Sequence, residues 1–282
     1  MKKNIKISIF IAVFITFFSC DDKVDVDVPE AAPRLVIEAS LDWEKGTSGN
    51  NQTIKLSTST PFFQNTLNTS VIGATVKVTN NDSNAVFNFV DQNDGTYTVN
   101  NFVPVLNNSY TLEVIYDGEM YTATENLTPI TEINEVFQSL EGGFDDELLD
   151  VNITYNDPAP LGNYYMIRMQ EVGDLFPLIE TRSDEFTNGN VQEEFFEKEE
   201  DTDDPTKQFN PGDEVNIKLY GISERYYNFI SLLIEQYDSA GNPFATTPAE
   251  IRGNCINLTN EANYAFGYFR VTEFDQVDYT FQ

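Results

Sequence analysis

Residues 110–124 read Tyr-Thr-Leu-Glu-Val-Ile-Tyr-Asp-Gly-Glu-Met-Tyr-Thr-Ala-Thr. Two runs in which apolar and polar side chains alternate flank the dipeptide Asp117-Gly118. Alternation with a period of two is typical of a strand buried on one face, and Asp-Gly favours the tight turns that join antiparallel strands. This stretch therefore predicts a β-hairpin.

The same pattern extends along most of the chain in both directions from this hairpin. Short alternating runs are separated by polar turns at intervals of about 8–12 residues, which favours an antiparallel β-sandwich. Further strands are predicted at 35–41, 54–56, 73–79, 85–90, 96–99, 133–140, 149–155, 163–170 and 212–220.

Two groups of residues resemble known sandwich domains. Gly73-Ala-Thr-Val-Lys-Val78 and Asp94-Gly-Thr-Tyr-Thr98 resemble transthyretin-like or carboxypeptidase-regulatory-like domains. Asp157-Pro158 followed by two tyrosines resembles immunoglobulin-like or fibronectin-like modules. These resemblances imply scaffolds rather than catalysts. We therefore expect a mainly β fold of two antiparallel β-sandwich domains, residues 34–130 and residues 131–282.

One amphipathic helix is predicted near residues 223–238, packed on the second sandwich. Ser223 is a suitable N-cap, and Gly241 with Pro243 would end the helix. Large apolar side chains recur at helical spacing on one face, which favours a buried face. These side chains are Tyr226, Phe229, Ile230, Leu233 and Tyr237.

The N-terminal segment predicts export and lipid attachment. Residues 1–19 carry three lysines and then an apolar run of signal-peptide length, and Ser19-Cys20 follows as in a lipobox. We expect cleavage before Cys20 and acylation of its thiol, for instance with palmitate. Residues 20–33 are rich in aspartate and proline and read as an acidic tether. Such a tether resembles the signal for display on the outer face of the outer membrane.

The chain is strongly acidic and contains no histidine. Its formal net charge is −30, which disfavours binding to nucleic acid or to anionic lipid headgroups and favours basic partners, divalent cations or simple solubility. Without histidine, neither a Ser-His-Asp nor a Cys-His catalytic arrangement can form. Cys255 is therefore expected to be a small core residue rather than a catalytic thiol, and no cofactor is expected.

An acidic insertion is predicted at residues 180–213. Eight carboxylates crowd residues 193–204, so this segment is either a solvated mobile loop or a site for a cation such as Ca²⁺. The nearest match to a calcium loop is interrupted by Phe186 and Phe195. Its candidate ligands are Asp184, Asn188, Gly189 and Asn190.

Motifs at both ends of the chain resemble a bacterial lipoprotein family, domain of unknown function 4249. They are Pro33-Arg-Leu-Val-Ile-Glu38, Pro61-Phe62-Phe63, Tyr226-Tyr-Asn-Phe229, Thr247-Pro-Ala-Glu-Ile-Arg-Gly-Asn254 and Ala265-Phe-Gly-Tyr-Phe269. Members of this family are typically found beside TonB-dependent outer-membrane receptors. The resemblance therefore implies an accessory role in nutrient uptake.

Three classes of function are consistent with the sequence. The leading hypothesis is a non-catalytic binding or accessory module for a TonB-dependent receptor, with an unknown ligand. The alternatives are a cation-stabilised structural surface protein and a glycan or peptide hydrolase that uses carboxylates such as Asp145, Asp146 or Asp157. Trp43, the single tryptophan, is either a ligand contact or a core residue. Cys20 is the only residue assigned a role.

Overall fold

The computed structural model describes residues 32–60, 69–143, 148–198, 208–239 and 250–282. Pro33–Gln282 form one compact unit. The predicted signal peptide, Cys20 and nearly all of the tether lie outside the described residues. The elements are β1 (Leu35–Glu44), β2 (Gln52–Thr58), β3 (Thr75–Asn80), β4 (Val86–Asp91), β5 (Thr96–Val99), β6 (Ser109–Tyr116), β7 (Glu119–Asn126), β8 (Ile133–Ser139), β9 (Asp150–Asn156), β10 (Tyr164–Glu171), β11 (Leu178–Ser183), β12 (Val191–Glu197), β13 (Glu214–Ile222), α2 (Glu224–Asp238), β14 (Ile256–Asn257) and β15 (Phe266–Thr280).

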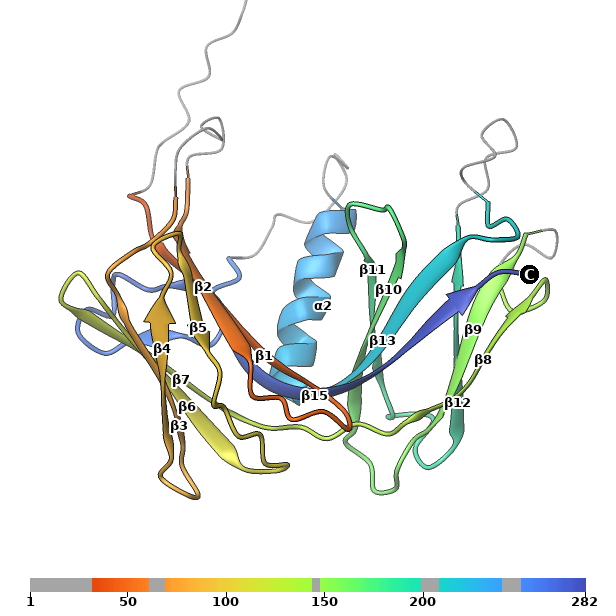
Figure 1. The fold of residues 1–282 in the computed structure, drawn as a ribbon, viewed down its shortest axis with the longest axis horizontal. Coiled ribbons are helices and arrows are strands. Elements are labelled where there is room, and N and C mark those ends of the chain that lie inside the picture. The colour runs from red at the N-terminus through yellow and green to blue at the C-terminus, as the bar shows by residue number, and fades with distance from the viewer. Residues whose placement is uncertain (1–31, 61–68, 144–147, 199–207, 240–249) are drawn as a thin grey trace, which may run out of the picture. The chain divides into compact units, whose positions relative to one another are not determined.

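The strands form a large sheet and a small one, which confirms the prediction of a mainly β fold. The large sheet has the order β11-β10-β13-β15-β1-β2-β5-β4-β3-β6-β7-β14, and the small sheet has the order β12-β9-β8 (Figure 1). The hairpin predicted from residues 110–124 is β6–β7, in which Tyr116 pairs with Glu119. Asp117 and Gly118 form its turn with φ values of 50° and 77°, as the tight hairpin turn requires.

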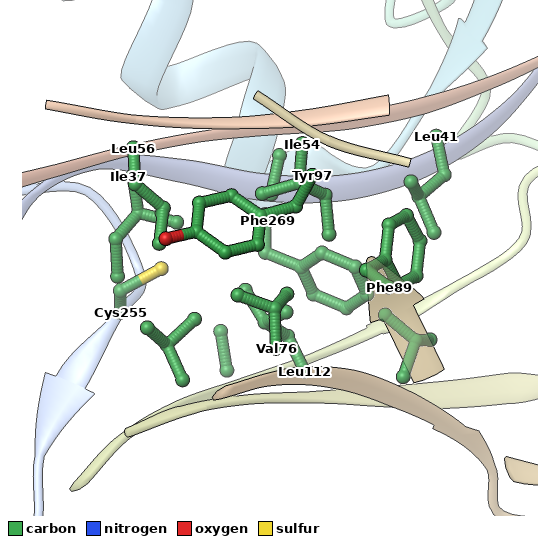
Figure 2. Packing of buried hydrophobic residues seen from close by; sticks show 14 of the residues in the cluster. Ile37, Leu41, Ile54, Leu56, Val76, Phe89, Tyr97, Leu112, Cys255 and Phe269 are labelled. Carbon is green, nitrogen blue, oxygen red and sulfur yellow. The ribbon is translucent and has the colours of Figure 1, made fainter. Parts of the chain in front are cut away.

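The first core lies between two layers of the large sheet. Alternate side chains of β1 and β2 are buried there, among them Ile37, Leu41 and Leu56, and residues of β3, β6 and β7 close it from the other side. In Figure 2 strands lie above and below these side chains. Cys255 and Phe269, from the C-terminal part of the chain, also belong to this core. The N-terminal sandwich is therefore completed by residues that lie beyond the predicted boundary at residue 130.

The second core lies between the small sheet and the other part of the large sheet. Val151 and Ile153 of β9 meet Ile167 of β10 and Ile217 of β13 there. The alternation along β9, β10 and β13 places these side chains on one face, as the period of two predicts. Each buried side chain of this size contributes about 1.5–3 kcal/mol to stability.

Strand β15 belongs to both cores. Phe269 and Val271 pack in the first core, whereas Val277 and Tyr279 on the same face of the strand pack against the second. The strand pairs in parallel with β1, with Ile37 opposite Gly267, and antiparallel with β13. The parallel pair differs from the purely antiparallel sheets expected from the sequence, because hairpin signals describe only strands that are neighbours in the chain.

Helix α2 covers the opposite face of β10, β13 and β15. Ser223 caps it, since its hydroxyl accepts the N–H of Tyr226 at 3.2 Å, as predicted. Tyr226 is buried and packs edge-on against Tyr268. Leu233 and Tyr237, however, are exposed by 38% and 81%, so the predicted apolar face is buried only in the first half of the helix. The predicted stop signals lie outside the described residues.

The segment predicted as a mobile acidic insertion contains regular structure. Residues 180–183 belong to β11, and β12 pairs along its whole length with β9. Glu194 of β12 is buried beside Arg182, so a charge that the sequence suggested was solvated is paired. Residues 199–207 lie outside the described part. The helix of the described residues is too short and too polar to span a membrane.

Candidate functional site

A groove of about 970 Å³ lies between β11 and the C-terminal half of α2. Large apolar side chains line it, and two of them are strongly exposed: Phe176 by 76% and Tyr237 by 81%. Contiguous exposed apolar surface on a soluble domain marks a contact site more often than isolated exposed residues do. The other apolar side chains of the groove are Pro177, Leu178, Ile179 and Ile234.

One wall of the groove is an edge strand. Strand β11 stands at the end of the large sheet, and β10 is its neighbour in that sheet. Residues of the C-terminal end of α2 and of the turn between β10 and β11 line the same groove. In Figure 1 the end of the helix and this turn both lie at the top of the view. Edge strands carry backbone donors and acceptors that a further strand can use.

The other wall is acidic. Glu235 and Asp238 line the groove, and no basic residue occurs in the last turn of α2. The carbonyl end of a helix carries partial negative charge, so carboxylates there are unfavourable and cations are favourable, by about 0.3–1 kcal/mol each. Arg182, which also lines the groove, is held by Glu194, whose two oxygens accept its Nε–H at 2.8 and 2.9 Å.

The charge of Arg182 is fixed by this pairing. Burial lowers the pKa of its guanidinium, but the charges of Glu194 and Glu180 outweigh burial and raise the pKa overall. For Glu194 burial dominates, and its pKa is raised despite Arg182. The ion pair links β11 to β12 and leaves the acidic wall of the groove without compensation from this arginine.

A second buried charge lies beneath α2. Arg270 is 7% exposed, and it donates to Asp42 at 2.9 Å. Its guanidinium carbon lies 4.8 Å from the ring centre of Tyr226 and 5.1 Å from that of Tyr220. Nε of Arg270 and Oδ1 of Asp42 are buried without a hydrogen-bond partner. This cluster joins β1, β13 and β15 to the helix.

Asp157, the candidate catalytic acid that lies within the described residues, is engaged in hydrogen bonds inside the fold. Asp157 is buried and accepts the Tyr165 hydroxyl and the N–H of Gly189, the latter at 2.8 Å. These bonds hold the loop between β11 and β12 against β10. Asp145 and Asp146 lie outside the described residues.

The nearest match to a calcium loop is likewise built into the fold. Asp184 is buried and accepts the N–H of Gly162 at 2.9 Å and the side chain of Asn163 at 3.1 Å. Burial raises the pKa of Asp184, but these hydrogen bonds outweigh it and lower the pKa overall. Among the described residues, no three carboxylate or cysteine side chains gather as a metal site would require.

Trp43 is a packing residue. It is half-buried against the first core, and its Nε1–H donates to the carbonyl of Thr47 at 2.9 Å. Gly49 lies so close that a Cβ there would be 2.5 Å from the indole. The position of Trp43 thus supports the turn after β1.

Cys255 is expected to be unreactive in the folded protein. It is buried in the first core, and burial raises the pKa of its thiol to about 12 (Figure 2). In a Cys20→Ser variant, where Cys255 is the sole cysteine, iodoacetamide at pH 8 should alkylate the native protein at least about 100-fold more slowly than the protein in urea. Burial favours the neutral thiol over the thiolate in the folded protein, whereas the unfolded chain ionises at the ordinary pKa of cysteine, about 8.5. The free energy of unfolding should therefore decrease as the pH rises above this value. Equal alkylation rates in native and unfolded protein would contradict the buried placement.

Sequence reasoning missed the groove. The residues Leu175-Phe176-Pro177-Leu178 form an apolar run inside an otherwise acidic region, and this was the available signal. Tyr237 was expected in the core because it falls at helical spacing with Tyr226. The helical spacing shows that the two tyrosines lie on one face of the helix, but it does not show how far the sheet extends beneath that face.

Comparisons with solved structures return proteins of low similarity, among them fibronectin type III domains. The three fibronectin domains of chicken CNTN1 match at 12% identity and a TM-score of 0.25, covering 69% of this chain and 62% of that one. A two-domain fibronectin type III segment of chicken tenascin matches at 9% identity and a TM-score of 0.22, covering 68% and 91%. A DUF4785 family protein from Legionella pneumophila matches at 12% identity and a TM-score of 0.27, covering 66% and 52%.

The search of curated proteins found no match. A comparison with family models found one that matches residues 21–276, which include every described element up to most of β15. This match covers the first core, the helix and most of the second core. The chain therefore belongs to the family described as Domain of unknown function (DUF4249).

Proposed function

We propose that this protein is a non-catalytic binding module that a lipid on Cys20 holds at the outer face of the outer membrane, where it serves a TonB-dependent uptake receptor. The lipobox at Ser19-Cys20 and the acidic tether support the location. The resemblance of the sequence motifs to a lipoprotein family found beside such receptors supports the partner.

The observation that carries the binding role is the apolar groove between β11 and α2. Phe176 and Tyr237 expose 76% and 81% of their surface, and among the described aromatic side chains only Phe186, which lies outside the groove, is more exposed. Large aromatic side chains in a concave setting contribute strongly to protein–protein affinity. Placed beside an edge strand, they offer a receptor or its cargo both apolar surface and backbone hydrogen bonds.

Affinity capture from native membranes tests this proposal. The full-length protein, purified in mild detergent from its own cells, should bring a TonB-dependent barrel with it. The double variant Phe176→Ser and Tyr237→Ser should recover at least about tenfold less of the barrel, since it loses two exposed anchors without disturbing a core.

A matched control removes exposed apolar surface elsewhere. Val90 and Val103 are exposed by 64% and 56% and lie outside the groove, so Val90→Ser with Val103→Ser should recover the barrel as the wild type does. Failure of the wild-type protein to recover a barrel at native abundance would refute the receptor role. Equal recovery by the groove variant would refute the groove as its contact site.

A further inference from the structure

We infer that the outer edge of β11 receives an extended strand of a partner, with apolar side chains toward the groove and a lysine or arginine beside the C-terminal end of α2. The inference deepens the proposed binding role by naming the surface and the chemistry of the partner. It rests on three features of the described residues: the hydrogen-bonding pattern of β11, the direction of its side chains and the charge of the groove.

The hydrogen-bonding pattern follows from the register of β10 and β11. Asp184 donates its N–H to the carbonyl of Asn163 at 3.1 Å, which makes this pair a hydrogen-bonded one. In an antiparallel ladder such pairs alternate, so residues 180 and 182 also face β10 with their backbone groups. The N–H and C=O groups of Ile179 and Ser183 and the N–H of Thr181 consequently point to the outer edge, whereas the Thr181 carbonyl already accepts the Nη1–H of Arg182 at 3.0 Å.

The side chains of the same residues turn toward the helix. The hydroxyl of Thr181 lies 2.9 Å from that of Ser231 in α2, and Ile179 packs with the aromatic cluster beneath the helix. A strand added at this edge would therefore place alternate side chains in the groove, against Ile234 and Tyr237. Strand β11 has six residues and is about 20 Å long, so a partner segment of about six residues matches it.

The charge of the groove selects a basic partner. Glu235 and Asp238 face it from the helix end, and within the described residues no ion pair reaches either carboxylate. Residues 240–249, which follow the helix, contain no lysine or arginine. A cation supplied by a partner would offset both the carboxylates and the helix dipole.

The same charges argue against a second copy of this chain as the occupant. Pairing two β11 edges would bring the acidic groove walls of two copies together, and each copy carries a formal charge of −30. Like charges brought together across an interface cost several kcal/mol in total. A basic segment of another protein fits the edge better.

Titration with a labelled peptide tests the inference. The probe is acetyl-Lys-Val-Thr-Val-Thr-Val-Lys-amide. It carries a lysine at each end, so one lysine reaches the acidic residues whether the peptide binds parallel or antiparallel to β11. Binding is measured by fluorescence anisotropy at low salt. The wild-type protein should bind it at least about tenfold more tightly than the same peptide with glutamate in place of lysine. Equal binding of the two peptides, or binding of neither, would overturn the inference.

Two substitutions at Thr181 separate the backbone from the side chain. Thr181→Pro removes the outward N–H, which β10 does not use, and should weaken binding of the lysine peptide by at least about tenfold. Thr181→Val keeps the N–H and loses only the hydroxyl contact with Ser231, so it should bind within about twofold of the wild type. Equal melting temperatures of the two variants establish that both fold. Equal binding by the proline variant would overturn the edge-strand assignment.

Charge variants complete the test. The double variant Glu235→Gln and Asp238→Asn should bind the lysine peptide about tenfold more weakly than the wild type. The double variant Asp117→Asn and Glu141→Gln, which removes two exposed charges elsewhere, should bind it as the wild type does. If sedimentation shows a dimer that Thr181→Pro disrupts, the occupant is a second copy and the inference is wrong. Receptor capture tests the whole protein and peptide titration tests the edge alone, so the proposed function and this inference can fail separately.

Discussion

Replacing Arg270 with alanine should lower the free energy of unfolding by about 3 kcal/mol, because a buried ion pair that loses one partner leaves an uncompensated charge. Asp42, its partner at 2.9 Å, has a side chain that is only 28% exposed. The substitution also removes the guanidinium from the rings of Tyr220 and Tyr226. Urea denaturation followed by circular dichroism measures the change.

The control for this prediction is an exposed ion pair between β2 and β1, the strand that carries Asp42. Lys55 lies 3.3 Å from Glu38 with both side chains more than half exposed, and Lys55→Ala should cost less than about 1 kcal/mol. Arg270→Met combined with Asp42→Asn should recover part of the loss, since neither charge then remains. A loss for Arg270→Ala no larger than that for Lys55→Ala would contradict the buried pairing.

Replacing Gly267 with alanine should cost at least about 3 kcal/mol, or prevent folding altogether. Gly267 has φ +92°, and a Cβ there would lie 2.1 Å from the carbonyl oxygen of Ile37. That oxygen belongs to the backbone of β1, opposite Gly267 in the parallel pair, and it cannot move without opening the ladder. The melting temperature should fall by about 2–4 °C for each kcal/mol lost in a chain of this size.

Gly118 provides the matched comparison. It has φ +77° in the turn between β6 and β7, but no atom lies within 4 Å of the position of its Cβ. Gly118→Ala should therefore cost only the conformational penalty, about 1 kcal/mol. If the two alanine variants lose the same stability, the close approach of β15 to β1 is not as described.

The sequence predicts those strands whose two faces differ. In β1 the residues Ile37, Ala39 and Leu41 are buried and alternate with the polar residues Glu38, Ser40 and Asp42, so the period of two is visible without any knowledge of the partner strand. Ser223 identifies the start of α2 because a cap depends only on the residues that follow it. Residues close together in the sequence are therefore sufficient to predict both the strand and the start of the helix.

The features that escaped prediction depend on partners outside the local stretch of sequence. Glu194 is buried on β12 because Arg182 pairs with it, and either residue by itself suggests a solvated loop. The parallel pairing of β1 with β15 has no local signal at all, since no turn connects them. For the same reason the groove was not predicted: it forms where the sheet ends at β11 while the helix continues.

The position of β15 has a consequence for the order in which the chain can fold. The first core contains residues from Leu35 to Leu127, yet it also needs Phe269 and Val271 from the C-terminal strand. When the chain is synthesised from its N-terminus, the β6–β7 hairpin can form early. The edge of β1 that pairs with β15 remains unpaired until β15 has been synthesised. Contacts of such high contact order form slowly, because the entropy of closing a long loop is lost before they contribute. Both cores therefore close late and together, and the exposed edge of β1 is where a chaperone would be needed until then.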